Sequence, residues 1–550
     1  EADLKDPSQF RLIGQDVMRV ELPQKVNGTA QYSIDVRPPG LVYAAVLHTP
    51  VAEGVPETID DSAAMESDGV VAVERLAHGV GVLADTPWAA FQGKQALTVT
   101  WAHQSPGQSF NSERGMQAYA AAARGDSPAQ PPFDSEGAVE AALDAADRLY
   151  EGEYRSDFAY HAQMEPLNAV ASVAPDGRSC EIWVGTQGQV LAVAATAQAL
   201  GIAHDQVTLH EMLLGGGFGR RGPRDQAFLI DAVLLSERLR RPVKVLWTRE
   251  DDVRNGRFHP MSASFIRAGL NAEGQLTAWH HRKASDNATA SMDGARHFEE
   301  QSDGTDIISM EGITVPTYAI PNRLSEQIPQ ISGMRTIALR GIGFVHNKFA
   351  TEALIDEIAV QEGRDPVEFR LSLLGDHPRA TRIIETVAEM SNWGTTPEDH
   401  GLGMAYIDYD TTQVATVIDV AVDAQTGAIR VHNVWLAIDC GLAVQPDNVI
   451  AQQEGCTVYG LGLALSESIS MDEGAVQQSN FHDYMIPRMW DIPNIEIRLV
   501  RSPGPPSGAG QMATPVIAPA ISNAVAAATG VRLRHLPMTR ARVRAALGAG

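Results

Sequence analysis

The stretch that decides the fold is Gly215-Gly216-Gly217-Phe218-Gly219-Arg220-Arg221. A strand predicted over 207–214 runs straight into it, and the segment 225–239 that follows is apolar at helical spacing. Glycines at four of five positions let backbone N–H groups approach a ligand closely. The segment lacks the Lys-Ser/Thr of a P-loop and the GxGxxG spacing, so neither ATP nor a dinucleotide is indicated. On the glycines alone, a tight strand–turn–helix without a ligand is an equally good interpretation.

Two further glycine-rich segments follow. Arg340-Gly341-Ile342-Gly343 places a fixed cation beside a glycine pair, and an arginine there can hold an anionic group with two hydrogen bonds. Ser507-Gly508-Ala509-Gly510-Gln511 leads into a predicted alanine-rich helix over 518–529, whose N-terminal donors would suit an anion or oxo ligand. Taken singly, a surface arginine beside a turn and a loop cap are the better interpretations. Together, the three loops predict a large ligand gripped from several sides.

Composition excludes several classes of protein. With 550 residues, 44% hydrophobic and 20% charged, the chain resembles an ordinary globular protein, and its length suggests three or four domains or lobes. A net charge of −25 repels phosphate backbones, so nucleic-acid binding is disfavoured. Cys180, Cys440 and Cys456 have no CxxC or Cys/His spacing, which gives no sign of a zinc or iron–sulfur site within this chain. No stretch approaches the roughly 20 apolar residues that cross a bilayer.

The remaining pattern predicts a mixed α+β and α/β fold. Short β-rich runs between 20 and 101 indicate a small α+β domain, and the Gly, Ser, Gln and Pro content of 102–136 indicates a linker with one or two helical turns. Further elements are predicted as helices over 190–200, 349–362 and 367–374, and as strands over 414–422 and 429–438 joined by a Thr426-Gly427 turn.

Ordered motifs along nearly the whole chain carry a resemblance to a known family. They are Phe10-Arg11-Leu12-Ile13-Gly14, Lys25-Val26-Asn27-Gly28-Thr29-Ala30, His161-Ala162-Gln163-Met164-Glu165-Pro166, Thr186-Gln187, the loop 215–221, the RGIG…HNxFAxExxIDExA…DPxEFRLxLL run of 339–374, Asp439-Cys440-Gly441, Gln453-Glu454-Gly455, the segment 478–484, and Thr514-Pro515-x-Ile517-Ala518-Pro519-Ala520. In this order they resemble the large, molybdopterin-binding subunit of the xanthine oxidase and aldehyde oxidase family. The loop 215–221 is most similar to the branch of isoquinoline 1-oxidoreductase β subunits.

The resemblance implies an architecture. It implies an N-terminal strap and an α+β "hammerhead" domain over 1–105, a linker over 106–135, a first molybdopterin-binding lobe over 136–335 and a second over 336–550. The two lobes would be elongated and would clasp the cofactor between them.

The resemblance also implies cofactor-binding residues, namely Gly217, Phe218, Gly219, Arg220, Arg340, Gly341 and Gly510. The Phe218-Gly219 backbone would face the oxo ligand of the metal, Arg340 would contact the pterin, and Gly510 and Gln511 would lie beside the metal. No side chain of this chain is expected to ligate the metal directly.

The implied cofactor is molybdenum–molybdopterin, in its cytosine dinucleotide form. The implied reaction hydroxylates an electron-poor N-heterocycle or an aldehyde with oxygen from water. Electrons would leave through a separate [2Fe–2S] subunit and, in this branch, often a cytochrome c partner. Because the branch is exported, a periplasmic location is expected, although the sequence shows no export signal.

One departure from the family concerns the catalytic position Gln511. Family members carry there a glutamate that removes a proton during attack on the substrate, and an amide cannot accept that proton. Four readings stay open: an engineered Glu→Gln change, a base recruited elsewhere, a different reaction on the same scaffold, or an inactive homologue. The candidate replacement bases are His161, Glu165, Asp408 and Asp410, although each is more often a hydrogen-bonded structural residue.

A second departure concerns the segment that normally precedes the hammerhead domain, with a twin-arginine signal and a Met-Gly-Gln-Gly-type loop. Since neither is present, we expect an N-terminal companion chain from the same precursor to complete the cofactor cradle and to cover apolar surface. A shortened chain is the alternative.

Two other functions compete with the oxidoreductase. One is a cofactor-free, repurposed hydrolase of amides or esters, against which the lack of a GxSxG segment and of an N-terminal Ser, Thr or Cys counts. The other is a non-catalytic scaffold or assembly factor.

Overall fold

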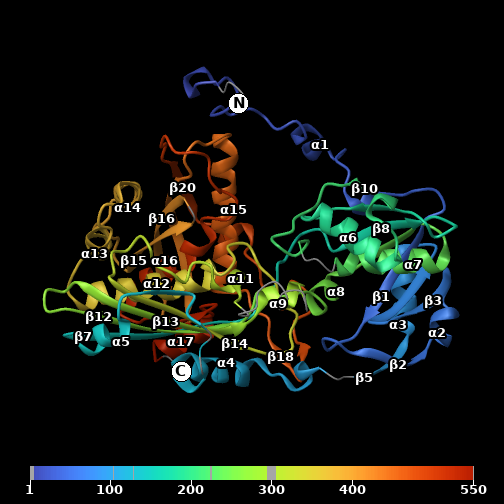
Figure 1. Ribbon diagram of the computed structural model, residues 1–550, viewed down its shortest axis with the longest axis horizontal. Coiled ribbons are helices and arrows are strands. Elements are labelled where there is room, and N and C mark those ends of the chain that lie inside the picture. The colour runs from blue at the N-terminus through green and yellow to red at the C-terminus, as the bar shows by residue number, and fades with distance from the viewer. Residues whose placement is uncertain are drawn as a thin grey trace.

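The computed structural model describes residues 5–102, 105–127, 129, 131–222, 226–293, 305–409 and 411–548. These residues form two bodies joined side by side, with the N-terminal strap running over one edge of both (Figure 1). One body is built on a seven-stranded sheet. The other contains a six-stranded and a four-stranded sheet.

The seven-stranded sheet has the strand order β10-β9-β8-β11-β1-β4-β3. Its strands are β1 (Val42–His48), β3 (Val70–Leu76), β4 (Gly79–Ala84), β8 (Asn168–Val173), β9 (Cys180–Val184), β10 (Val207–Glu211) and β11 (Val243–Leu246). The helices α6 (Gln189–Leu200) and α7 (Ala227–Leu239) pack together, and α7 lies on β8 and β11. Because β1 pairs in parallel with β11, this sheet joins strands from the predicted hammerhead region to strands from the predicted first lobe. The predicted domain boundaries themselves stay a prediction.

Smaller elements complete this body. They are α2 (Ser62–Met65), α3 (Pro87–Ala96), α8 (Arg249–Arg254) and the antiparallel pair β2 (Val55–Asp60) and β5 (Thr98–Ala102).

The six-stranded sheet has the order β21-β7-β12-β13-β14-β6. Its strands are β6 (Asp134–Glu136), β7 (Arg148–Ser156), β12 (Ser262–Leu270), β13 (Leu276–Asp286), β14 (Asn322–Gln330) and β21 (His535–Leu536). The long helix α12 (Phe344–Gln361) packs on β7 and β12 and is buried over nearly its whole length. The helices α5 (Val139–Asp144), α9 (Ala288–Asp293), α11 (Ile307–Met310) and α13 (Pro366–Leu373) lie around this sheet and α12.

The predicted linker contains more structure than one or two helical turns. Helix α4 (Ser112–Ala121) begins at Asn111, whose side chain caps it, and it buries Met116, Tyr119 and Ala120. It packs on β12, β13 and β7. The Tyr119 hydroxyl donates to Asp286 of β13 at 2.7 Å, so a segment of linker-like composition is anchored in the core by one side chain.

The four-stranded sheet has the order β15-β16-β17-β20 and lies in the largest apolar core. Its strands are β15 (His400–Tyr409), β16 (Thr412–Asp423), β17 (Ala428–Asp439) and β20 (Asn494–Leu499), and the pair β18 (Met471–Asp472) and β19 (Ala475–Val476) lies apart. The helices α14 (Pro378–Met390) and α16 (Thr514–Thr529) pack on it, α15 (Pro446–Leu465) packs on α16, and α17 (Arg540–Ala546) contacts β17. The predicted hairpin is confirmed, with Gly427 in its turn at φ +70°.

The predicted helices are confirmed, with shifted beginnings. Helix α6 ends at Leu200, as predicted, and Gly201 after it adopts the left-handed conformation. Helix α12 begins five residues earlier than predicted, at Phe344, and α16 begins four residues earlier, at Thr514. Pro515 occupies the first turn of α16, where its missing N–H costs nothing. Both shifts bring a helix N-terminus closer to the glycine-rich segment before it.

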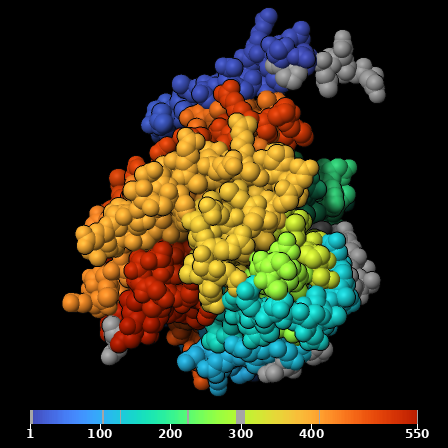
Figure 2. All heavy atoms as spheres, turned by 90° about the vertical axis from the view of Figure 1, so that its left-hand side faces the viewer, coloured from blue at the N-terminus to red at the C-terminus, as the bar shows by residue number. Residues whose placement is uncertain are grey.

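The strap crosses the second body close to the start of α15, as the space-filling view also shows (Figure 2). The Gly14 N–H donates to the Val444 carbonyl at 2.9 Å, and the Asp16 carboxylate accepts from the Asp447 N–H at 2.9 Å. Within the strap, α1 (Leu22–Asn27) has no buried residue, and Val20 is 95% exposed. Among the described residues, no helix combines the length and the apolar content needed to span a membrane.

Gly403 tests the packing of α16 on β15. A Cβ at this glycine would overlap the Ala520 carbonyl oxygen and the Ala524 N–H of α16. We expect Gly403→Ala to lower the free energy of unfolding by about 1–3 kcal/mol, because the helix backbone has to move. Chemical denaturation measures this. Gly504→Ala is the control, since the nearest atoms to its new Cβ lie 3.9 Å away, and an equal loss in both variants would contradict this account.

Candidate functional site

The three glycine-rich segments meet at one place. The Arg340 N–H donates to the Phe218 carbonyl at 3.0 Å. The Arg340 guanidinium donates to the Gly510 carbonyl from Nε at 3.1 Å and from Nη2 at 2.8 Å. The Gly341 N–H donates to Gln511 Oε1 at 3.0 Å. The predicted convergence of the three loops is therefore confirmed, while their contact with a cofactor stays a prediction.

The first loop keeps its shape because Arg221 is buried beneath it. Its guanidinium donates to the carbonyls of Gly216 at 3.0 Å, Gly185 at 3.1 Å and Glu165 at 2.9 Å, and to the Glu165 carboxylate at 3.0 Å. The charge is thus paired and its donors are used, as a buried arginine requires. Arg221, the second arginine of the segment 215–221, therefore has a structural role.

Two residues at the tip of the loop have unusual backbone conformations. Phe218 adopts φ +52°, which a non-glycine residue rarely does, and Gly219 adopts φ +109°. A Cβ at Gly219 would overlap the Ala338 carbonyl, so the close approach of the neighbouring segment requires glycine. Gln187 Oε1 accepts from the Gly219 N–H at 3.1 Å and from the Arg221 N–H at 3.3 Å.

Aromatic stacking fixes the Phe218 side chain against α15. Its ring centroid lies 4.8 Å from that of Tyr459, with the planes 28° apart, and the Arg340 guanidinium carbon lies 5.9 Å from the Phe218 ring. The Tyr459 hydroxyl donates to the His161 carbonyl at 3.0 Å. The tip of the first loop is thereby held between the second loop and a helix of the other body.

Arg220 faces a different direction from the neighbouring site residues. It is 1% exposed, and its guanidinium carbon lies 5.7 Å from the Trp247 ring, inside the body of the seven-stranded sheet. Of the predicted cofactor-binding residues, Phe218, Arg340, Gly341 and Gly510 contact one another or Gln511 directly, whereas Gly217 and Gly219 shape the loop around them.

Gln511 is held at both ends of its amide. Its Oε1 accepts from Gly341, and its Nε2 donates to the Tyr409 hydroxyl at 2.7 Å. The Tyr409 hydroxyl donates in turn to Glu311 Oε2 at 3.2 Å. This Gln511–Tyr409–Glu311 chain was not predicted from the sequence, because its members lie about 100 residues apart and carry no shared motif.

Three of the four candidate replacement bases are described, and each of them is engaged in contacts within the fold. Glu165 pairs with Arg221 and also accepts from the Gly215 N–H at 2.8 Å, and Asp408 pairs with Lys348 at 3.4 Å. His161 is buried, its Nε2 contacts the Ala338 carbonyl at 3.0 Å, and burial lowers its pKa to about 4. It does not share a helix with Glu165. Asp410 lies outside the described residues.

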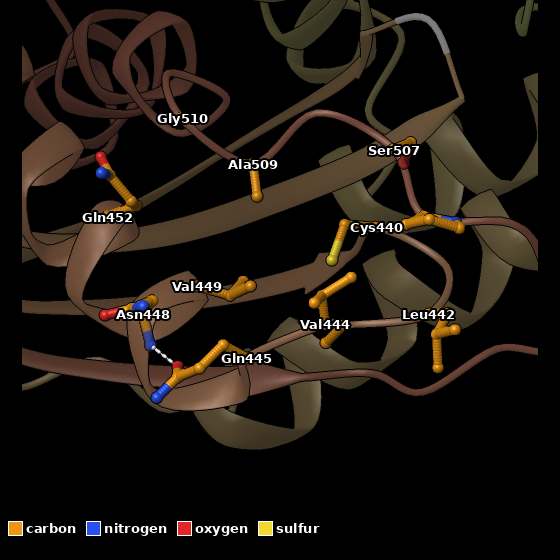
Figure 3. A pocket seen from close by; sticks show the side chains of 12 residues that line it. Cys440, Leu442, Val444, Gln445, Asn448, Val449, Gln452, Ser507, Ala509 and Gly510 are labelled. Atoms are coloured by element: carbon orange, nitrogen blue, oxygen red, sulfur yellow. Dashed lines mark hydrogen bonds between the residues drawn. The ribbon is translucent and has the colours of Figure 1, made fainter. Parts of the chain in front are cut away.

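A cavity of about 270 Å³ opens beside the third loop (Figure 3). It is lined by Cys440, Leu442, Ala443, Val444, Gln445, Asn448, Val449, Gln452, Pro506, Ser507, Ala509 and Gly510. A Cβ at Gly510 would meet nothing within 4 Å, so this glycine faces open space. The side-chain amides offer both donors and acceptors. Helix α15 begins at the cavity, and its first N–H groups donate to Asp16 and Gln445.

The residues around this cavity fit a molybdopterin cofactor. Gln453 Oε1 and Thr514 Oγ1 are buried without a hydrogen-bond partner among the described residues. Gln453 donates from Nε2 to the Ala509 carbonyl at 2.6 Å, and the Thr514 N–H donates to the Gln511 carbonyl at 3.2 Å, so both flank the third loop. Unused polar atoms, neutral amides and the Arg340 cation suit a ring with alternating donors and acceptors that carries a phosphate.

A buried acid lies behind the stacked aromatics. Burial raises the pKa of Glu467 to about 8, although the Tyr484 hydroxyl donates to its Oε2 at 2.8 Å. The Tyr484 hydroxyl is also 2.8 Å from the Tyr160 carbonyl. Near neutral pH this carboxyl is therefore mainly protonated in the folded protein.

Comparison with known proteins defines the class. Family models of the molybdopterin cofactor-binding domain match residues 127–373 and residues 379–493. The chain thus carries both halves of a molybdopterin-binding unit.

Individual proteins define the family. The isoquinoline 1-oxidoreductase subunit beta of Brevundimonas diminuta is 37% identical over 549 residues, which cover 97% of this chain and 69% of that protein. A membrane-bound aldehyde dehydrogenase (pyrroloquinoline-quinone) of Gluconacetobacter polyoxogenes is 31% identical, covering 98% of this chain and 73% of that protein. The crystal structure of quinoline 2-oxidoreductase from Pseudomonas putida 86 superposes with a TM-score of 0.84 at 16% identity and covers 98% of both chains.

The chain therefore belongs to the xanthine oxidase family of molybdopterin-binding large subunits, and it is a molybdenum hydroxylase-type oxidoreductase subunit. The family prediction and the prediction of a molybdopterin-binding oxidoreductase are confirmed, as is the mixed α/β fold.

Replacing Arg340 tests whether the interlock of the loops holds the cofactor. We expect Arg340→Ala to lower the molybdenum content per chain at least several-fold, because the variant loses charge-assisted hydrogen bonds to Gly510 and Gln452. Elemental analysis of the purified protein measures this. Arg178→Ala, in an exposed turn, is the control. Full molybdenum occupancy in a folded Arg340→Ala protein would contradict the role of Arg340.

The raised pKa of Glu467 predicts a pH dependence of stability. The unfolded chain releases this proton above its ordinary pKa of 4.5, but the folded chain keeps it up to about pH 8. The folded state therefore binds more protons in this window, and stability falls as the pH rises through it. We expect Glu467→Gln to flatten the decline of unfolding free energy between about pH 5 and 8. Denaturation at several pH values measures the slope, with the exposed Glu113→Gln as control. An unchanged slope would contradict the assignment.

Proposed function

We propose that this chain is the large subunit of a molybdenum hydroxylase or dehydrogenase that oxidises an N-heteroaromatic compound or an aldehyde. The observation that carries the proposal is the interlock of the loops through Phe218, Arg340 and Gly510 beside a polar cavity. The substrate classes are supported by two of the relatives, which are named as an isoquinoline 1-oxidoreductase subunit and an aldehyde dehydrogenase.

The proposal includes the finer architecture and the partners. The strap and hammerhead domain cover 1–105, the linker 106–135, and the two lobes 136–335 and 336–550. A relative named as a subunit beta supports partner subunits. We assign the electron path to a separate [2Fe–2S] subunit and a cytochrome c, and the location to the periplasm.

The chain's own residues position the cofactor in this proposal. Arg340 and the side-chain amides of the cavity hold the polar edge and the phosphate of the cofactor. We propose that the cofactor is the dinucleotide form. The Phe218-Gly219 backbone and Gly341 bring the first and second loops to the same edge. Gly510 leaves space for a bulky group where any side chain would occupy it. When bound, the group supplies the redox chemistry that these side chains lack.

Gln511 stands in the place of the family's base glutamate and limits proton transfer. A positioned base contributes about 10²–10⁴ in rate, which an amide cannot supply. Here Gln511 passes a hydrogen bond through Tyr409 to Glu311, so the nearest carboxylate on this chain of contacts lies two hydrogen bonds away. The Gln511 amide therefore orients the loop through its hydrogen bonds and does not accept a proton.

Gln511→Glu restores a carboxylate at the same position. It can accept from Gly341 and from the Tyr409 hydroxyl, so the fold tolerates the change. We expect the turnover number in dye-linked oxidation to rise about 10²-fold or more at unchanged molybdenum content, because a base becomes available. Gln445→Glu, on the wall of the same cavity, controls for the added negative charge. An unchanged or lower turnover in Gln511→Glu would mean that position 511 does not serve as the base site in this protein.

The native complex tests the proposed function as a whole. Elemental analysis reports the metal, and intact-mass measurement reports the companion chains and the residue at 511. Dye-linked oxidation of heteroaromatics and aldehydes that scales with molybdenum content supports the proposal. Oxidation that persists without molybdenum would overturn it.

A further inference from the structure

A cluster of two histidines and one aspartate lies outside the cofactor site. His48 ends β1, His78 lies in the turn between β3 and β4, and Asp231 projects from α7. Asp231 Oδ2 is 3.0 Å from His48 Nε2, and Asp231 Oδ1 is 2.6 Å from His78 Nε2. The three ligand atoms lie within 4.8 Å of one another.

The sheet register brings the two histidines together. His48 pairs with Gly79 across β1 and β4, so His78 follows directly beside it. The face of α7 that carries Asp231 also carries Leu235 one turn later, and a Cβ at Gly81 of β4 would lie 2.7 Å from Leu235. Close packing of α7 on β4 therefore places the Asp231 carboxylate beside both imidazoles.

The surroundings of Asp231 favour a positive charge beside it. Its side chain is 1% exposed, and its neighbours on α7 include the buried Phe228, Ala232 and Leu235. A carboxylate in such surroundings is stable only when it is paired. Both hydrogen-bond contacts of the Asp231 carboxylate are to imidazole nitrogens, one on His48 and one on His78.

We propose that His48, His78 and Asp231 bind a divalent transition-metal cation, with Zn²⁺ the best match. Two imidazole nitrogens and one carboxylate oxygen form a donor set that zinc accepts, with water in the fourth position. In a tetrahedral zinc site the donor atoms lie roughly 3.3 Å apart, so the three ligand atoms, which lie within 4.8 Å of one another, draw together by up to about 1.5 Å when the ion binds. The His78 side chain is 43% exposed and gives the ion a route from solvent, while His48 is packed on the Trp247 ring at 4.7 Å.

The metal ties α7 to the paired strands β1 and β4. Asp231 lies on the helix that follows the first glycine loop, but none of the three residues takes part in the interlock of the loops. His48 Nδ1 has no hydrogen-bond partner among the described residues. A hydrogen bond to the second ring nitrogen of a metal-binding histidine usually strengthens a site about 10–100-fold. Because His48 lacks this hydrogen bond within the described part of the chain, we expect a zinc affinity in the micromolar range rather than tighter.

The test uses the full chain, freed of exchangeable metal with EDTA and titrated with ZnCl₂ against a chromophoric chelator. We expect one saturable Zn²⁺ per chain, a higher unfolding temperature with zinc, and the visible absorption of a four-coordinate site when Co²⁺ replaces it. His78→Gln keeps an N–H that can donate to Asp231 but loses the imidazole ligand. We expect it to lower the zinc affinity about tenfold or more, with unchanged unfolding of the metal-free protein and unchanged dye-linked oxidation.

His210→Gln is the matched control, because His210 also pairs with a carboxylate, Glu181, at 2.8 Å but has no third ligand among the described residues. It should bind zinc as the unaltered chain does. No saturable zinc in the unaltered chain, equal affinity in His78→Gln, or a loss of binding in His210→Gln would overturn the proposal. The cluster would then be a hydrogen-bonded clamp alone.

Discussion

The structure depends most on the hydrogen bonds that Arg340 makes in two directions. Its backbone N–H holds the Phe218 carbonyl, and its guanidinium holds the Gly510 carbonyl with two donors and Gln452 with a third contact. Hydrogen bonds from a charged donor are shorter and stronger than neutral ones, so one side chain can define the distance between two loops. Segments separated by more than 100 residues meet here, and everything proposed about the cofactor follows from that meeting.

The same constraint explains why these loops are rich in glycine. At Gly219 a side chain would occupy the space of the Ala338 carbonyl, and at Gly341 the backbone adopts φ +99°. At Gly510, in contrast, nothing fills the space that a side chain would take. Glycine therefore allows close backbone approach at Gly219, permits a positive φ at Gly341 and leaves room for a ligand at Gly510. These are different physical reasons behind one compositional signal.

The sequence predicted the parts of the fold that depend on local pattern. The hairpin around Gly427, the end of α6 before Gly201 and the order of the glycine loops all follow from turn chemistry and periodicity. The sequence could not predict that β1 pairs with β11, that Tyr409 links Gln511 to Glu311, or that His48, His78 and Asp231 lie together. Such contacts depend on strand order and helix packing over long separations, and no spacing of residues records them. Arg220 shows the same limit, since its position in the motif does not reveal that its side chain turns inward to Trp247.

Anomalous X-ray scattering at the molybdenum edge, recorded from crystals of the native complex, tests the central claim most directly. The account predicts a single molybdenum peak beside the Phe218-Gly219 backbone and Gln511, with pterin density in contact with Arg340. Crystals of active protein without such a peak, or with the peak away from the three loops, would contradict it.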